Sequence, residues 1–148
     1  MSVVTSFIAN DSLYRLMPGI QQVMKKILDF GTTAAADGAT IQAMKVENGM
    51  LLGRVYCRLM TPEGGTTSCT MDVGDGDDPN GYLSAVSLTA ATDTVVSSSF
   101  TSDAYAANGR WYLADDTIDV IIKGATGTAK VEIVAPFARI DTNDQSTY

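Results

Sequence analysis

The part of the sequence richest in groups that could do chemistry is the acidic loop at residues 74–81, GDGDDPNG. In and just before it lie five side chains with hard oxygen atoms of the kind that bind Ca²⁺: Asp72, Asp75, Asp77, Asp78 and Asn80. Counted from Asp75, a twelve-residue calcium loop requires Gly at its sixth position and a bidentate Glu at its twelfth. This chain has Asn80 and Val86 there. The pattern therefore favours a solvated turn over an ion site, and we predict no metal and no cofactor.

The chain contains no histidine, which is the residue that usually activates a serine or cysteine nucleophile. Histidine is the usual proton carrier near neutral pH and the commonest metal ligand, so a His-dependent triad, a Cys–His pair and a His-ligated zinc site are excluded. Cys57 and Cys69 fall on the inward positions of alternating segments, which favours buried thiols over a disulfide or a nucleophile. Asp115 and Asp116 are adjacent acids in a turn and point in different directions, unlike a glycosidase pair. We predict that the protein is not an enzyme.

Four aromatic residues could instead form a platform for a sugar: Tyr82, Tyr105, Trp111 and Tyr112. Trp111 belongs to a short alternating segment, which favours a place in the core.

Composition limits the partners. The net charge is −7, from 10 basic and 17 acidic residues, and phosphate binding needs a basic surface, so a nucleic-acid partner is not expected. No run approaches the ~20 apolar residues that span a bilayer, and the N-terminus lacks a secretory pattern. We expect cytoplasmic synthesis, no membrane association, and a partner with a basic surface.

About eight short alternating segments separated by Gly, Asp and Pro turns predict an all-β sandwich or barrel. Residues 50–60 are interpreted as one strand, with Leu51 on the same inward face as Val55. Residues 47–49 and 124–127 are expected to be hairpin turns. Pro136 predicts that the segment 128–135 lies at a sheet edge or kinks. Residues 20–30 are ambiguous, since their apolar spacing favours a helix.

We expect an N-terminal arm at residues 1–19, a sandwich domain at 20–141 and a flexible tail at 142–148.

Three stretches carry a resemblance to a known family: LDFGTTAAADGATIQAMKVENGMLLGRVYCRLMTPEGG, MDVGDGDDPNGYLSAVSL and YLADDTIDVIIKGATGTAKVEIVAPFARI. Together they resemble the small jelly-roll cement, or decoration, proteins of tailed bacteriophages. The resemblance implies a jelly-roll-like antiparallel β-sandwich that coats an icosahedral head built from the major capsid protein. It also implies a strand at residues 23–30 and a turn at the acidic loop, and it carries no catalytic residues.

The expected function is therefore a viral structural protein that cements neighbouring capsomers from outside the capsid, as a dimeric or trimeric homo-oligomer at a local symmetry axis. The arm is the expected link to a neighbour, with Tyr14, Arg15 and Leu16 as capsid contacts, because aromatic and Arg residues dominate interface energetics. The alternative is a carbohydrate- or receptor-binding sandwich on a virion surface or tail.

Overall fold

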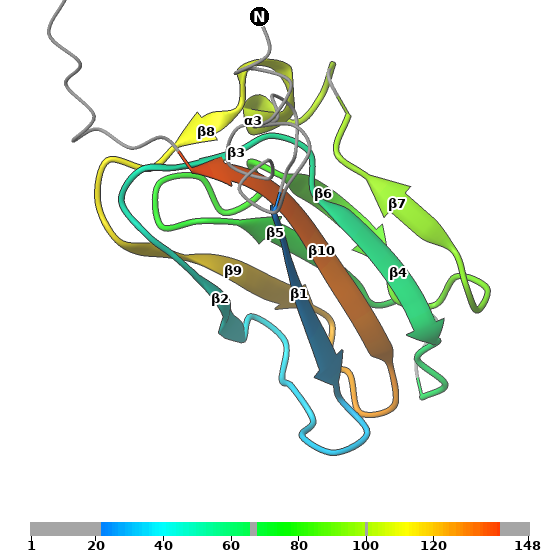
Figure 1. Cartoon of the computed structure of the whole chain (residues 1–148). Helices are drawn as coiled ribbons and strands as arrows, with labels where there is room; N and C mark the ends of the chain where they lie inside the picture. Colours follow the sequence, from blue (N-terminus) through cyan, green and yellow to red (C-terminus); the bar gives the residue numbers. More distant parts are fainter. Residues whose placement is uncertain (1–21, 66–67, 100, 140–148) are drawn as a thin grey trace, which may run out of the picture.

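A computed structural model describes residues 22–65, 68–99 and 101–139. They form two antiparallel sheets packed face to face (Figure 1). The sheet that we call the β10 sheet contains β1 (Gln22–Asp29), β3 (Met50–Leu52), β4 (Tyr56–Thr61), β7 (Val95–Ser97), β8 (Arg110–Trp111) and β10 (Lys130–Arg139). The sheet that we call the β9 sheet contains β2 (Thr40–Val46), β5 (Thr70–Gly74), β6 (Leu83–Ser87) and β9 (Asp116–Lys123). A short helix, α3 (Ala104–Asn108), lies between β7 and β8.

The connectivity is that of a jelly roll. The β9 sheet has the order β2-β9-β5-β6, and β10 is the central strand of its own sheet, with β1 on one edge and β4 and β3 in succession on the other. The chain passes from one sheet to the other between β1 and β2, β2 and β3, β4 and β5, β6 and β7, β8 and β9, and β9 and β10. This confirms the predicted all-β jelly-roll-like sandwich.

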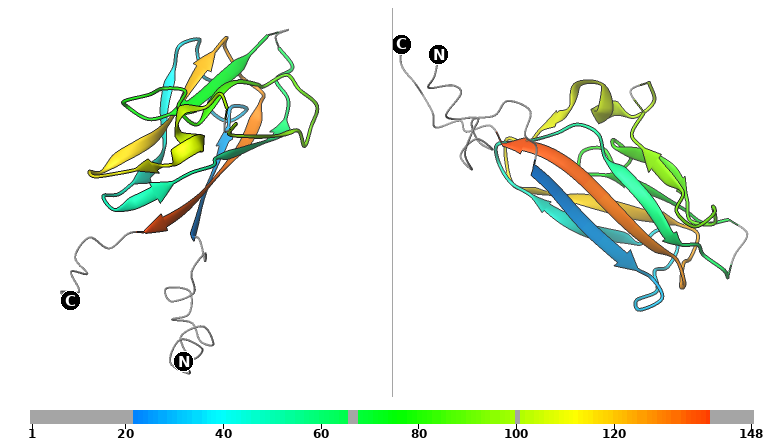
Figure 2. Two further views of the ribbon diagram at one scale, coloured as in Figure 1. Left: turned by 90° about the horizontal axis from the view of Figure 1, so that it is seen from above. Right: turned by 45° about the vertical axis from the view of Figure 1, so that its right-hand side comes forward.

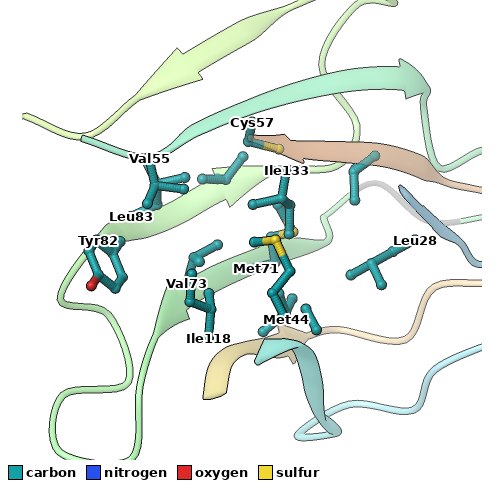
Figure 3. Close-up of a cluster of buried hydrophobic side chains, with 14 of the residues drawn as sticks. Leu28, Met44, Val55, Cys57, Met71, Val73, Tyr82, Leu83, Ile118 and Ile133 are labelled. Atoms are coloured by element: carbon teal, nitrogen blue, oxygen red, sulfur yellow. The ribbon is translucent and has the colours of Figure 1, made fainter. Parts of the chain in front are cut away.

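The core lies between the sheets and follows the period-two alternation of the strands. Val131, Ile133 and Ala135 of β10 are fully buried, and so are Ile118 and Val120 of β9. Figure 3 shows Ile133 of β10 beside Met71 of β5 in this interior. Each isoleucine so buried contributes about 2 kcal/mol, which makes the interior the main source of stability.

Residues 22–29 form the strand β1, as the resemblance predicted, although the apolar spacing of 20–30 favoured a helix. β1 pairs with β10 from Gln22 opposite Phe137 to Asp29 opposite Lys130. An isolated eleven-residue helix is only marginally stable in water, whereas the extended segment gains a full ladder of hydrogen bonds.

Residues 50–60 are not the single strand that the alternation predicted. The chain leaves the ladder at residues 53–55, so Met50 and Leu52 of β3 face inward and Leu51 faces outward. The expected hairpins at 47–49 and 124–127 are also wrong, because each turn joins strands of different sheets.

Pro136 lies in a central strand, which corrects the expectation of an edge. It falls at the gap between the β4 pairing, which ends at Val134, and the β3 pairing, which begins at Phe137. Phe30 N–H donates to the carbonyl oxygen of Ala129, so odd-numbered residues of β10 bond to β1. The missing N–H of Pro136 therefore faces the gap, where no ladder bond is lost.

Candidate functional site: buried carboxylates and an apolar face

The acidic loop is anchored by one buried carboxylate, Asp75, whose side chain is fully inaccessible to solvent. One oxygen accepts the Tyr105 hydroxyl at 2.9 Å and the backbone N–H groups of Asp77 and Asp78 at 3.0 and 2.9 Å. The other accepts Arg110 Nε at 3.1 Å and the Tyr112 hydroxyl at 3.0 Å. Five donors occupy this carboxylate, so it ties the loop to α3 and β8.

The surroundings of Asp75 keep it ionised. Burial by itself would raise the pKa of Asp75, but hydrogen bonds from the Asp78 backbone and from the Tyr105 and Tyr112 hydroxyls outweigh it, and the pKa is lowered. The Arg110 guanidinium lies 5.0 Å from the centre of the Tyr105 ring and 5.4 Å from that of Tyr112. The charge is thus paired and enclosed by aromatic faces, which is how a buried ion pair becomes tolerable.

The neighbouring oxygen-bearing groups are occupied by cations and backbone donors of the protein itself. Asp72 binds Lys123 at 2.5 Å and accepts the N–H of Ala85 at 2.8 Å, while Asp77 pairs with Arg110. Within the described ranges, no group of three or more His, Cys, Asp or Glu side chains converges as metal ligands do. The geometry gives the loop a structural role.

Glu63 is another buried carboxylate, besides Asp72, Asp75 and Asp103, and the sequence did not single it out. One of its oxygens accepts the Thr126 hydroxyl at 2.5 Å and the N–H groups of Gly127, Thr128 and Ala129 at 2.8, 2.9 and 3.1 Å. Its other oxygen accepts Gly65 N–H at 3.0 Å. These bonds, led by the Thr126 hydroxyl, hold the pKa of Glu63 well below its usual range. Because its partners are mostly backbone groups some sixty residues away, no sequence pattern could have indicated them.

The two cysteines are free and buried, which agrees with the favoured interpretation. Burial raises the pKa of the Cys57 thiol to about 12, so this thiol does not ionise near neutral pH. Cys69 Sγ donates to the carbonyl oxygen of Gly124 at 3.2 Å. Neither environment activates a nucleophile.

The candidate aromatic platform is not assembled. Tyr82 and Tyr112 are buried, with their hydroxyls 2.8 Å apart, and belong to the Asp75 cluster. Trp111 was expected in the core, but its side chain lies on the surface with 45% exposed, because β8 pairs with β3 at Leu51, which faces outward. Asp115 accepts Asn48 N–H and binds Lys45, whereas Asp116 bonds to the backbone of Thr117, so these two acids do not act together.

The outer surface of the β10 sheet carries most of the large apolar side chains that are exposed in the described part of the chain. In the described part of the chain, the large apolar side chains that are exposed are Val23, Ile27, Val95, Trp111 and Leu113. The first four are strand residues, and all four point outward from the β10 sheet. The same outer surface carries half-buried apolar residues, Leu51, Tyr56, Val134, Pro136 and Ala138, while the Arg58–Glu132 ion pair lies between Ile27 and Val95. We call these nine apolar strand residues the apolar face.

The outer surface of the β9 sheet differs in kind. Its strands present polar or charged side chains outward: Thr40, Gln42, Lys45, Thr70, Asp72, Thr117, Asp119 and Lys123. Ile121 is the one large apolar residue that the described register places among them, and it is half-buried. We call this surface the polar face. The two flat sides of the sandwich (Figure 2) are therefore chemically unequal.

The predicted capsid contacts Tyr14, Arg15 and Leu16 lie outside the described residues, as do the arm at 1–19 and the tail at 142–148. In the described part of the chain, no helix is long and apolar enough to cross a membrane.

Three solved structures that are similar to this chain all come from bacteriophage capsids. No family model and no curated protein matches the chain. Among solved structures, it is similar to a chain of the acid-stable capsid of the Helicobacter pylori bacteriophage KHP30, at 12% identity and TM-score 0.59, covering 79% of this chain and 86% of that one. It is also similar to a chain of the cyanophage Pam1 capsid asymmetric unit, at 15% identity and TM-score 0.61, covering 79% and 83%.

A third neighbour belongs to the capsid of the Ralstonia phage GP4, at 14% identity and TM-score 0.60, covering 82% of this chain and 85% of that one. At these identities the likeness is one of fold. The chain therefore has the jelly roll that is also found in chains of three bacteriophage capsids.

Proposed function

We propose that this chain is a structural protein of a bacteriophage virion, which binds the outside of the icosahedral head and cements neighbouring capsomers of the major capsid protein. The observation that carries the proposal is that three structural neighbours, from three different phages, all come from capsids. A shared fold alone does not define a function, but here the context of the neighbours agrees as well as their fold.

The extent of the similarity supports a small coat component. The shared fold takes up most of this chain and most of each neighbouring chain, so the matched proteins are of similar size and consist largely of this one domain. A protein of this kind can add to a shell as a separate unit.

The two faces suit such a coat. The apolar face offers contact area for the head, while the polar face and a net charge of −7 keep the unbound protein soluble. Many copies bound to one shell make weak individual contacts durable. The arm, with Tyr14, Arg15 and Leu16, would reach a neighbour, and assembly as a dimer or trimer at a local axis fits the symmetry of a head.

The test uses phage heads that lack this protein. Purified protein is added, unbound protein is removed by sedimentation, and the heads are imaged by electron cryomicroscopy. We expect density at regular positions outside the shell and release of packaged DNA at a higher temperature than from untreated heads. Failure to bind, or density confined to the tail, would overturn the proposal.

The exposed Trp111 favours a second candidate, a carbohydrate- or receptor-binding module of the virion, since exposed aromatic rings stack on sugars. Binding to a glycan array that is lost in Trp111→Ala would support it. Tyr56→Ala, on the same face, serves as the matched control.

A further inference from the structure

One edge of the β10 sheet ends in unpaired backbone groups. β1 pairs with β10 along its whole length, and no described strand pairs with its other side (Figures 1 and 2). Even-numbered residues of β1 bond to β10, because Phe30 N–H donates to Ala129 in the same ladder. The N–H and C=O groups of Val23, Lys25 and Ile27 therefore point away from the sheet. Such an edge is a template for another strand.

A groove runs beside the same edge. It has a volume of about 390 Å³ and is lined mainly by apolar residues, among them Leu28, Phe30, Ala35 and Ile41, together with Thr33 and with Asp29, whose charge Lys130 pairs. A strand added to β1 would place side chains of one row in this groove, beside the C-terminal end of β1, and those of the other row beside Val23, Lys25 and Ile27. Such a strand would thus meet apolar surface next to a lysine on each side.

The charge of the edge indicates the charge of the strand that it would bind. Lys25 and Lys26 are both exposed, and within the described residues neither makes an ion pair, whereas Lys130 nearby binds Asp29 at 3.0 Å. The edge is a positive site on a protein of net charge −7. Carboxylates on an incoming strand would find complementary charge on each side of the sheet.

A second copy of this chain fits the edge poorly. Two β1 strands that pair antiparallel about the middle of the strand place Lys25 opposite Lys25, or Lys26 opposite Lys26. Like charges directly opposite each other destabilise a sheet. The lysines thus discourage self-association and leave the edge open to an acidic strand.

We propose that the free edge of β1 binds an extended, acidic segment of the shell protein of the same head by strand addition, with alternating apolar side chains in the groove. That the segment comes from the shell protein rests on the proposed function. That the edge binds an acidic strand does not, so strand binding and head binding can be tested separately.

The experiment titrates the full chain with a capped nonapeptide of alternating valine and glutamate, and with its counterpart that has lysine in place of glutamate. Amide hydrogen exchange, followed by NMR, reports which N–H groups become bonded. We expect the acidic peptide to slow exchange of the Val23, Lys25 and Ile27 amides by at least about tenfold, and the basic peptide to bind about tenfold more weakly.

Two variants of Lys25 separate the contribution of its backbone N–H from that of its side-chain charge. Lys25→Pro removes an N–H that points to the free edge and leaves the bonds to β10 intact, so it should abolish binding. Lys25→Ala keeps that N–H and should weaken binding only about threefold. Unchanged far-ultraviolet circular dichroism would show that the Pro variant folds.

Equal binding of both peptides, binding that survives Lys25→Pro, or no protection at millimolar peptide would overturn the proposal. Protection that rises with protein concentration alone would assign the edge to a second copy and also overturn it. If the peptide binds but heads do not bind the protein, the edge site stands and the proposed function fails.

Discussion

Two regions of this molecule reverse the ordinary distribution of side chains, and they do so in different ways. The buried carboxylates Asp75 and Glu63 place charge inside, and the apolar face places large hydrophobic residues outside. Asp75 and Glu63 each accept five hydrogen bonds from the protein itself. The exposed rings and chains of Val23, Ile27 and Trp111 have no comparable cover.

The difference teaches how to separate a structural feature from a functional one. A buried carboxylate whose hydrogen bonds are all made within the protein holds a loop in place and needs no external ligand. Exposed large apolar side chains remain in contact with water until something covers them. Substitutions should therefore affect folding in the first region and association in the second.

The largest effect on folding is expected at Asp75. Asp75→Asn sets an amide N–H₂ against hydroxyl and guanidinium donors, and it leaves Arg110 without its buried partner, so the free energy of unfolding should fall by about 3–4 kcal/mol. Urea denaturation measures it. The control is Asp77→Asn in the same loop, whose side chain is largely exposed and which should cost less than about 1 kcal/mol. If both variants lost the same free energy of unfolding, the burial of Asp75 would not be the reason for its contribution.

Glu63→Gln should come next, with a loss of about 2–3 kcal/mol at neutral pH, since the Thr126 hydroxyl and three backbone N–H groups share one charged acceptor. The pH dependence has a definite sign. The folded pKa of Glu63 lies below its unfolded value, so its contribution is complete above pH ~4.3 and is lost as the pH falls towards the folded pKa.

Stability curves of the two proteins between pH 7 and pH 2 check this directly. The difference between wild type and Glu63→Gln should shrink below pH ~4. A difference that stays constant over the whole range would show that the ionised carboxylate is not what stabilises this end of the sandwich.

Trp111→Ala tests the other side of the comparison. Binding to heads should weaken by about thirtyfold, because a large aromatic side chain that is buried in an interface commonly carries about 2 kcal/mol. The free energy of unfolding should change by no more than about 1 kcal/mol, since the ring is half exposed. Gln42→Ala on the polar face is the matched control and should change neither quantity. A large loss of stability with unchanged binding would assign Trp111 to the fold.

The smallest effect is expected from the arm. Deleting residues 2–17 removes Tyr14, Arg15 and Leu16 and should leave the unfolding transition unchanged, while occupancy on heads falls about tenfold. Sedimentation of heads with each protein measures this. Binding equal to that of the full chain would place the whole contact on the sandwich, and the apolar face would then have to account for it alone.

Local pattern predicted the strands well and their partners poorly. The alternation of 117–123 and 128–135 correctly gave the inward residues Ile118, Val120, Val131 and Ile133. It could not show that the turn between them crosses from one sheet to the other, since a short turn has the same local chemistry in either case. It also missed the break at residues 53–55, which reverses the direction of Leu51.

The candidate site was less predictable than the fold. The acidic loop was recognised as a turn, but that Asp75 would be buried beneath Tyr105, Tyr112 and Arg110 was not, because these residues come from a segment thirty or more positions later. The outward direction of Trp111 was missed as well, because it too depends on residues far away in the sequence. Its direction depends on the register with β3, which is a long-range property.

The sequence by itself determined the class of fold, the buried thiols and the lack of a histidine-based catalytic centre, since composition and short-range periodicity are local properties. The tertiary structure decided which carboxylates are buried, which side of the sandwich is apolar and which strand is left with a free edge. These depend on the pairing of strands far apart in the chain, and a shift of one residue in that pairing exchanges the two faces of a strand.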